Sequence, residues 1–147
     1  MKYLSLLMMT LLIFASSAIA FDAKKFFKSN CTACHLIGGG DKTGPDLAGV
    51  SKRRKVEWIV KFMNYPEGMI NGDEDEEDYP VKKGILNGKK ISYGDKVAYS
   101  LYQIYKPSVM TEHEVDEAQV KALLKYIDTV STTPKGKITK FKVLAIK

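Results

Sequence analysis

The stretch that decides the fold is Cys31-Thr32-Ala33-Cys34-His35, which holds both cysteines of the 147-residue chain and one of its two histidines. Two residues separate the cysteines, and the histidine follows the second cysteine directly. Secreted scaffolds that depend on disulfides carry more cysteines at longer spacing. The close spacing therefore indicates that both cysteines belong to one local binding or redox site.

Three kinds of site use such a pair. A thioredoxin-like redox pair belongs to a βαβ unit, whereas the patterns around this pair are helical. A zinc site needs two further ligands, but the only other histidine is His113 and no further cysteine exists. The third possibility is covalent attachment of a c-type haem, for which C-x-x-C-H is the signature.

The spacing of this signature has a mechanical reason. Cys31 and Cys34 lie on one helical turn, so each can form a thioether with one of the two haem vinyl groups. The next residue, His35, then lies against the porphyrin face and can bind the iron as the proximal ligand. We therefore expect one covalently attached haem c, with its iron, at these three residues.

The first twenty residues have the pattern of an export signal. Lys2 supplies a positive start, residues 4–14 form an apolar run, and Ala18-Ile19-Ala20 gives the small-x-small pattern that precedes cleavage. An uncleaved anchor is the alternative, but the apolar run is shorter than the about twenty residues that span a membrane. We expect a chain that begins at Phe21, has no stable membrane insertion and lies in the periplasm.

The rest of the chain has the length of one compact domain. Its basic residues exceed its acidic ones, and the formal net charge of the whole sequence is +6. This charge favours acidic partners but is too mild to imply nucleic acid. We expect a single domain over residues 21–131, a C-terminal extension over residues 132–147, and no nucleic-acid binding.

The first predicted helix leads the chain to the cysteine pair. Asp22 is placed to cap it, it runs towards Asn30, and Ala23 and Phe27 share one face. After His35 the glycines and prolines of residues 38–49 predict an irregular loop.

A second helix is predicted from an apolar stripe at helical spacing, with Ser51 as its cap and an end before Pro66. The stripe consists of Val56, Ile59, Val60 and Met63. The basic run at residues 52–55 opens this helix and is a candidate for docking an acidic partner.

Two more helices are predicted in the second half. Asp95 is placed to cap the third, which ends at Pro107. Thr111 and Glu114 form a capping-box pattern at the start of the fourth. Between the second and third helices, residues 71–93 begin with six consecutive acids at 73–78 and predict a solvated loop. The pattern of residues 132–147 fits either a strand or a loose helix.

The chain resembles the class I cytochromes c, in particular the small bacterial periplasmic members. Ala23 and Phe27 match the contact residues of the family's first helix, and Leu123 and Tyr126 match their partners on its last helix. Gly44-Pro45-Asp46-Leu47 matches the family loop in which the proline carbonyl accepts a hydrogen bond from the proximal histidine. This resemblance implies an all-α fold, a bundle of about four to five helices wrapped around one haem.

The resemblance also implies further site residues. The sixth iron ligand of the family is usually a methionine before the last helix, and Met110 lies there, although Thr111 stands where the family commonly has proline. The alternatives are Met69, which is expected in a loop, His113, which is expected to be exposed in the first turn of the last helix, and an open iron site. Trp58 lies on the helix that covers a haem edge in the family, where its indole either hydrogen-bonds a propionate or is simply buried.

These residues predict an electron carrier between a redox donor and an acceptor protein, without enzyme activity, and monomeric. No nucleophile–base pair is recognisable in the sequence. Two alternatives remain: a dedicated haem subunit of a larger oxidoreductase, docked through the acidic segment and the tail, and an open-site haem sensor or enzyme. Lys24, Lys25 and Lys28 join residues 52–55 as candidate docking residues.

Overall fold

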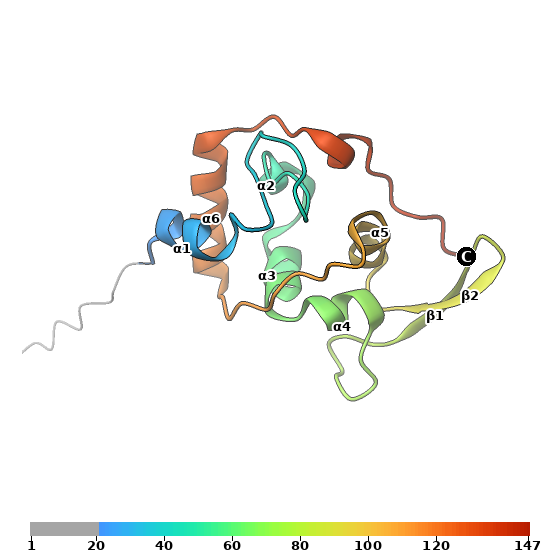
Figure 1. Cartoon of the computed structure of the whole chain (residues 1–147). Coiled ribbons are helices and arrows are strands. Elements are labelled where there is room, and N and C mark those ends of the chain that lie inside the picture. The colour runs from blue at the N-terminus through green and yellow to red at the C-terminus, as the bar shows by residue number, and fades with distance from the viewer. Residues whose placement is uncertain (1–20) are drawn as a thin grey trace, which may run out of the picture.

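The computed structural model describes residues 21–147, so the predicted export signal lies outside the described residues. Residues 21–147 form helices α1 to α6, one β-hairpin and one short 3-10 helix, η1 (Figure 1). The predicted helical fold is present, with a small hairpin added to it. Within residues 21–147 no helix is long and apolar enough to cross a membrane.

Helices α1 (Ala23–Asn30) and α6 (Glu117–Val130) pack against each other at one side of the molecule (Figure 1). The Asp22 carboxylate accepts the backbone N–H of Lys25 at 2.9 Å and caps α1 as predicted. The ring of Phe27 lies 5.7 Å, centre to centre, from that of Tyr126 on α6. The predicted pairing of the first and last helices is therefore present.

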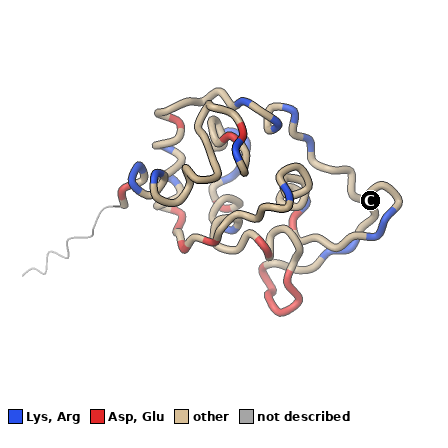
Figure 2. Tube along the Cα trace, viewed as in Figure 1, with Lys and Arg blue, Asp and Glu red and all other residues tan. Residues whose placement is uncertain are grey.

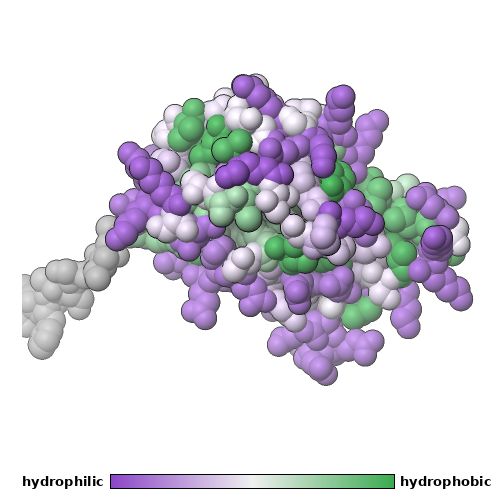
Figure 3. All heavy atoms as spheres, in the orientation of Figure 1, coloured by the Kyte–Doolittle hydropathy of each residue, from purple (hydrophilic) through white to green (hydrophobic). Residues whose placement is uncertain are grey.

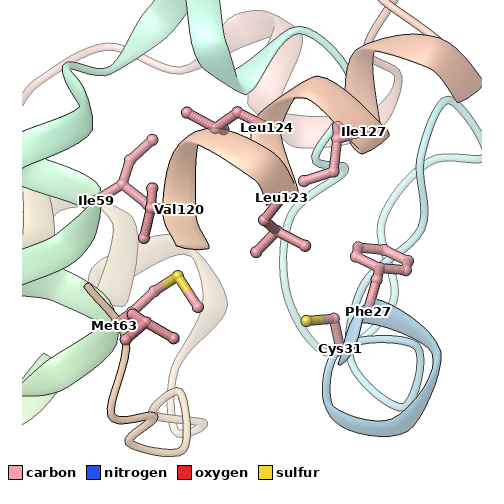
Figure 4. Packing of buried hydrophobic residues seen from close by; sticks show 9 residues of the cluster. Phe27, Cys31, Ile59, Met63, Val120, Leu123, Leu124 and Ile127 are labelled. Carbon is pink, nitrogen blue, oxygen red and sulfur yellow. The ribbon is translucent and has the colours of Figure 1, made fainter. Parts of the chain in front are cut away.

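The main hydrophobic core joins α1, α3 (Val56–Asn64) and α6. In Figure 4, Ile59 and Met63 of α3 face Val120 and Leu123 of α6, with α1 on the other side. The buried members of the core are Phe27, Cys31, Ile59, Met63, Val115, Val120, Leu123, Leu124 and Ile127.

The predicted second helix is wrong at its start, although it ends before Pro66 as predicted. It is divided into α2 (Val50–Arg53) and α3, and Ser51 lies inside α2, where its hydroxyl donates to the Asp128 carboxylate at 2.7 Å. Pro66 does end α3, but it also occupies the first turn of another helix, α4 (Pro66–Asn71). Proline is favoured there because its missing N–H has no partner in a first turn.

The predicted loop over residues 71–93 is correct only in its first half. The acidic residues 73–78 form a projecting loop (Figure 2), but β1 (Lys82–Leu86) and β2 (Lys89–Tyr93) pair as an antiparallel hairpin. Asn87 and Gly88 turn between the strands with φ of 51° and 78°. Positive φ at both positions is what a two-residue hairpin turn requires, and Asn-Gly is its commonest sequence.

Helix α5 (Lys96–Tyr105) begins as predicted, with the Asp95 carboxylate accepting two backbone N–H groups. Helix α6 begins later than predicted. Its capping box is formed by Asp116 and Gln119, and Thr111 lies in the preceding loop. The aspartate and glutamine form the same kind of capping box as the predicted threonine and glutamate, but later in the chain.

The C-terminal extension forms no strand and no α-helix, and its regular structure is one short 3-10 helix. After α6 it passes over the top of the molecule in Figure 1, makes the short turn η1 (Gly136–Lys140) and ends beside the hairpin. There Ile85 and Lys147 exchange two backbone hydrogen bonds, of 2.8 and 3.1 Å. The last residue thus lies along the edge of β1.

Candidate functional site

An apolar cavity lies between the helices and takes lining residues from all six helices, from the loops that carry His35 and Met110, and from η1. On the face shown in Figure 3, hydrophobic and weakly polar atoms lie near the middle and hydrophilic side chains project around the outline. The lining includes Cys31, Cys34, His35, Pro45, Arg53, Arg54, Trp58, Met63, Tyr102, Tyr105, Met110, His113, Leu123 and Ile138.

The two cysteines lie on one turn at the end of α1. The backbone carbonyl of Cys31 accepts the N–H groups of Cys34 at 3.1 Å and of His35 at 2.8 Å, so the turn is closed by its own backbone. Cys31 is buried and Cys34 exposed, and both side chains line the cavity. Burial, with a smaller contribution from Cys34, raises the pKa of Cys31 to about 11. As an unmodified side chain, Cys31 is therefore a neutral thiol at pH 7.

His35 is held in one orientation by the loop that follows it. Its Nδ1 lies 2.8 Å from the carbonyl oxygen of Pro45. A carbonyl can only accept, so Nδ1 carries the hydrogen and the lone pair of Nε2 remains available. A methyl group at Gly44 would lie 2.5 Å from His35 Cε1, so only glycine allows the loop to approach the ring this closely.

Burial lowers the pKa of His35, and the hydrogen bond to Pro45 opposes this effect only in part. The imidazole is therefore neutral near pH 7. A neutral ring with a fixed Nδ1–H and a free Nε2 is the state in which histidine binds a metal ion.

The same loop is organised around the fully buried carboxylate of Asp46. It accepts backbone N–H groups from Gly38, Gly40 and Ala48 at 2.7 to 2.9 Å, and one from Lys135 at 3.1 Å. Burial raises the pKa of Asp46, but these four hydrogen bonds outweigh burial and hold it below its ordinary value. Sequence reasoning missed this role, because the donors are backbone groups.

Two methionines and a second histidine line the same cavity. Met110 is half-buried on the loop before α6, and Met63 is buried on α3. Figure 4 shows the side chains of Met63 and Cys31 projecting toward one another. The sequence predicts a core position for Met63. In the structure, Met63 lies both in the core and in the cavity wall.

The surroundings of His113 and Met69 differ from those expected. His113 was predicted to be exposed on the last helix, but it is half-buried in the loop, with its ring 5.6 Å from that of Phe26. Met69 was expected in a loop, but it is buried in α4 and packs with Ile70 and Ala98.

Trp58 contributes its ring to the cavity wall, stacked on Phe62 at 5.0 Å. Its Nε1–H donates to the Asp95 carboxylate at 3.1 Å. The same carboxylate caps α5, so Trp58 ties α3 to the start of α5. Arg53 and Arg54 also line the cavity and are half-buried, which the sequence did not indicate.

Comparison with known proteins places this arrangement in a family. The cytochrome c family model matches residues 20–131. Among solved structures, a cytochrome c from Rhodothermus marinus is 28% identical, with 74% of this chain and 73% of that chain covered and a TM-score of 0.50. The cytochrome c domain of the pp3183 protein from Pseudomonas putida is 22% identical over 74% of this chain and 86% of that one, with a TM-score of 0.46.

The family match extends over most of the described chain and includes the cysteine pair, the histidine and the loop that orients it. It confirms the resemblance inferred from Cys31-Thr32-Ala33-Cys34-His35 and from the pairing of the first and last helices. The chain belongs to the cytochrome c family, and its cofactor is the covalently attached haem c of that family, with its iron.

Proposed function

We propose that this protein is an exported electron carrier that passes single electrons between a redox donor and an acceptor protein in the periplasm. One observation carries the proposal: a single apolar cavity brings together both thiols, a neutral imidazole with a free Nε2, and thioether side chains from other segments. Bound haem c supplies reversible one-electron chemistry at its iron.

The residues present fit this cofactor. Cys31 and Cys34 would form the two thioethers, because both line the cavity from one turn. His35 would bind the iron through Nε2, since Pro45 holds Nδ1. Trp58 would cover one edge of the haem with its ring, while its N–H remains bonded to Asp95.

We assign the sixth ligand to Met110. It lies on an irregular loop, whose backbone can adjust to bring the sulfur to the metal, and it lines the same cavity as His35. Met63 lines the cavity too, but it is fixed on α3 between core residues and only 6% exposed. Ligation by histidine and methionine raises the reduction potential and suits electron transfer.

Electron exchange would take place where the cofactor comes nearest to solvent. Thr32, Ala33 and Cys34 are all exposed, which marks this side of the cavity as thinly covered. The lysines of α1, at positions 24, 25 and 28, are exposed on the adjoining helix. A partner with an acidic surface fits this side.

The free carrier is favoured over a dedicated subunit of a larger complex. That alternative used two docking elements, the acidic segment and the C-terminal extension. Two apolar side chains of the extension, Ile138 and Ile146, are already buried within this chain, at 7% and 6% exposure.

Mass spectrometry and visible spectra of the exported protein test the proposal together. We expect the mass of residues 21–147 plus one haem, and spectra in which carbon monoxide leaves the reduced protein unchanged. A bare polypeptide mass with a Cys31–Cys34 disulfide would disprove haem attachment. Rapid binding of carbon monoxide would disprove a closed six-coordinate site and favour a sensor or enzyme.

A further inference from the structure

The C-terminal extension, residues 132–147, lies beyond the part of the chain that the family model matches. It nevertheless contacts the haem site at two places and is fastened at its far end. In Figure 1 it runs from the end of α6 across the molecule to the hairpin. We call residues 132–147 the strap.

The first contact is with the cavity itself. Ile138, on the turn η1, is buried and lines the cavity together with His35 and the residues of α6. A single isoleucine from the strap thus forms part of a wall that the helices leave incomplete.

The second contact is with the loop that orients His35. The strap donates the N–H of Lys135 to the Asp46 carboxylate at 3.1 Å and the N–H of Lys137 to the Asp41 carboxylate at 2.6 Å. Asp46 follows Pro45, whose carbonyl holds the His35 ring. The strap is therefore linked to the imidazole through one loop.

Further contacts keep the strap in place. The guanidinium of Arg54 lies 5.3 Å from the Phe141 ring and 5.4 Å from the Trp58 ring, so it is held between the strap and α3. The backbone N–H of Leu144 donates to the Ser100 hydroxyl at 3.0 Å. At the end, Lys96 Nζ donates to the Ile146 carbonyl at 3.0 Å.

We propose that the strap completes the haem site: Ile138 keeps water from the cofactor, and the bonds to Asp41 and Asp46 hold the orientation of His35. Both are positioning roles, exerted without contact to the iron. The inference rests on the proposed placement of the haem against His35. A dry, apolar surrounding disfavours the more highly charged ferric form and so raises the reduction potential.

A matched pair of variants tests the covering role. Ile138→Ala and Ile146→Ala remove the same atoms from two buried positions of the strap, but only Ile138 lines the cavity. We expect the potential of the haem protein, measured by spectroelectrochemical titration, to fall in Ile138→Ala and to remain at the parent value in Ile146→Ala. Equal potentials in the two variants would overturn the covering role.

A second pair of variants tests whether the strap keeps His35 in its orientation. Gly136 and Gly88 both have positive φ, at 81° and 78°. A methyl group at Gly136 would lie 2.5 Å from the Asp41 carboxylate, whereas at Gly88 it would meet nothing within 4 Å. The measurement is the paramagnetically shifted proton NMR spectrum of the ferric protein, which responds to the orientation of the axial imidazole.

We expect Gly136→Ala to shift these resonances and Gly88→Ala to leave them in place. Unchanged spectra in both variants, or equal changes in both, would overturn the positioning role. The parent protein separates this result from a failure of the proposed function: if the parent carries no haem or no histidine ligand, the placement of the haem itself is wrong, whatever the variants do.

Discussion

At His35 a single backbone carbonyl decides which ring nitrogen can bind a metal. Pro45 has no N–H of its own, and its carbonyl lies 2.8 Å from Nδ1. Gly44 has no side chain, and a side chain at this position would clash with the ring. Each residue of this short segment therefore acts on the imidazole through geometry rather than through charge.

Met110→Ala is the sharpest test at the residue scale. If Met110 is the sixth ligand, the variant should lose the weak far-red absorption of methionine-ligated ferric haem, have a lower reduction potential and bind carbon monoxide readily. Visible spectra and a redox titration measure all three.

Three control variants accompany it. Met69→Ala and His113→Ala should keep the band and the potential, because neither is assigned to the iron. Met63→Ala should also keep them, although it removes a buried core side chain and should lower the free energy of unfolding by about 2–5 kcal/mol. If Met63→Ala or Met69→Ala removes the band while Met110→Ala retains it, or if the parent itself lacks the band, the ligand assignment is wrong.

Asp46→Asn tests the carboxylate at the centre of the loop. The amide places an NH2 group against backbone donors, so the free energy of unfolding should fall by about 1–3 kcal/mol at pH 7. Asp75→Asn, in the exposed acidic loop, is the control and should change it little.

The effect of Asp46→Asn should depend on pH. The folded pKa of Asp46 lies below its ordinary value. A carboxylate of this kind stabilises the fold above its unfolded pKa of about 3.9, and the stabilisation is lost as the pH falls through the folded pKa. Denaturant unfolding at pH 7, 5 and 3 should show the gap to the parent narrowing at pH 3. A constant gap would contradict this account.

At the scale of the element, the start of α6 is set by the capping box of Asp116 and Gln119, which lies later in the sequence than the predicted box of Thr111 and Glu114. Asp116→Ala should lower the free energy of unfolding by about 1 kcal/mol, because it removes the acceptor of the Gln119 N–H. Thr111→Ala should have little effect, since Thr111 is exposed in the loop. A larger loss from Thr111→Ala than from Asp116→Ala, in thermal or denaturant unfolding, would favour the earlier cap.

The hairpin shows how a strong local signal is hidden by its neighbours. Asn87-Gly88 is a typical hairpin turn, but four lysines in the two strands make them look like a solvated loop. Pairing is stabilised from outside the hairpin, because Ile146 packs against Gly84 and Lys147 bonds to Ile85. Those contacts come from the other end of the chain.

At the scale of the whole molecule, charge is distributed unevenly. The acidic loop projects on one side, whereas the lysines of α1 and those of the hairpin lie towards opposite ends (Figure 2). Of the basic run at residues 52–55, only Lys52 and Lys55 are exposed, since both arginines are half-buried beside the cavity. The α1 lysines are therefore the better candidates for docking near the haem.

Electron exchange with an acidic partner should slow as salt is added, because the Debye length falls from about 30 Å at 0.01 M to about 10 Å at 0.1 M. Stopped-flow rates measure this dependence. Replacing Lys24, Lys25 and Lys28 by Gln should slow the exchange and weaken its salt dependence. Replacing Lys82, Lys83 and Lys90 by Gln makes the same change of charge on the hairpin and should have less effect. Equal effects would contradict docking at α1.

Local sequence patterns were sufficient to predict the cofactor, the helical class of the fold and the caps of α1 and α5. The cysteine pair and His35 are adjacent in sequence, so their chemistry does not depend on distant contacts. Asp22 and Asp95 cap helices through hydrogen bonds that span two or three residues. Interactions of such short range can be predicted from the order of the residues.

Only the tertiary structure decided which distant residues share the cavity. Asp46 and Lys135 are 89 residues apart and bond through a backbone N–H, which every residue except proline possesses. Ile138 has the same side chain as Ile146, but one lines the cavity and the other packs on the hairpin. The residue type does not show which of the two isoleucines lines the cavity. Hydrophobic burial is non-directional, so it depends on where the tertiary structure places each segment.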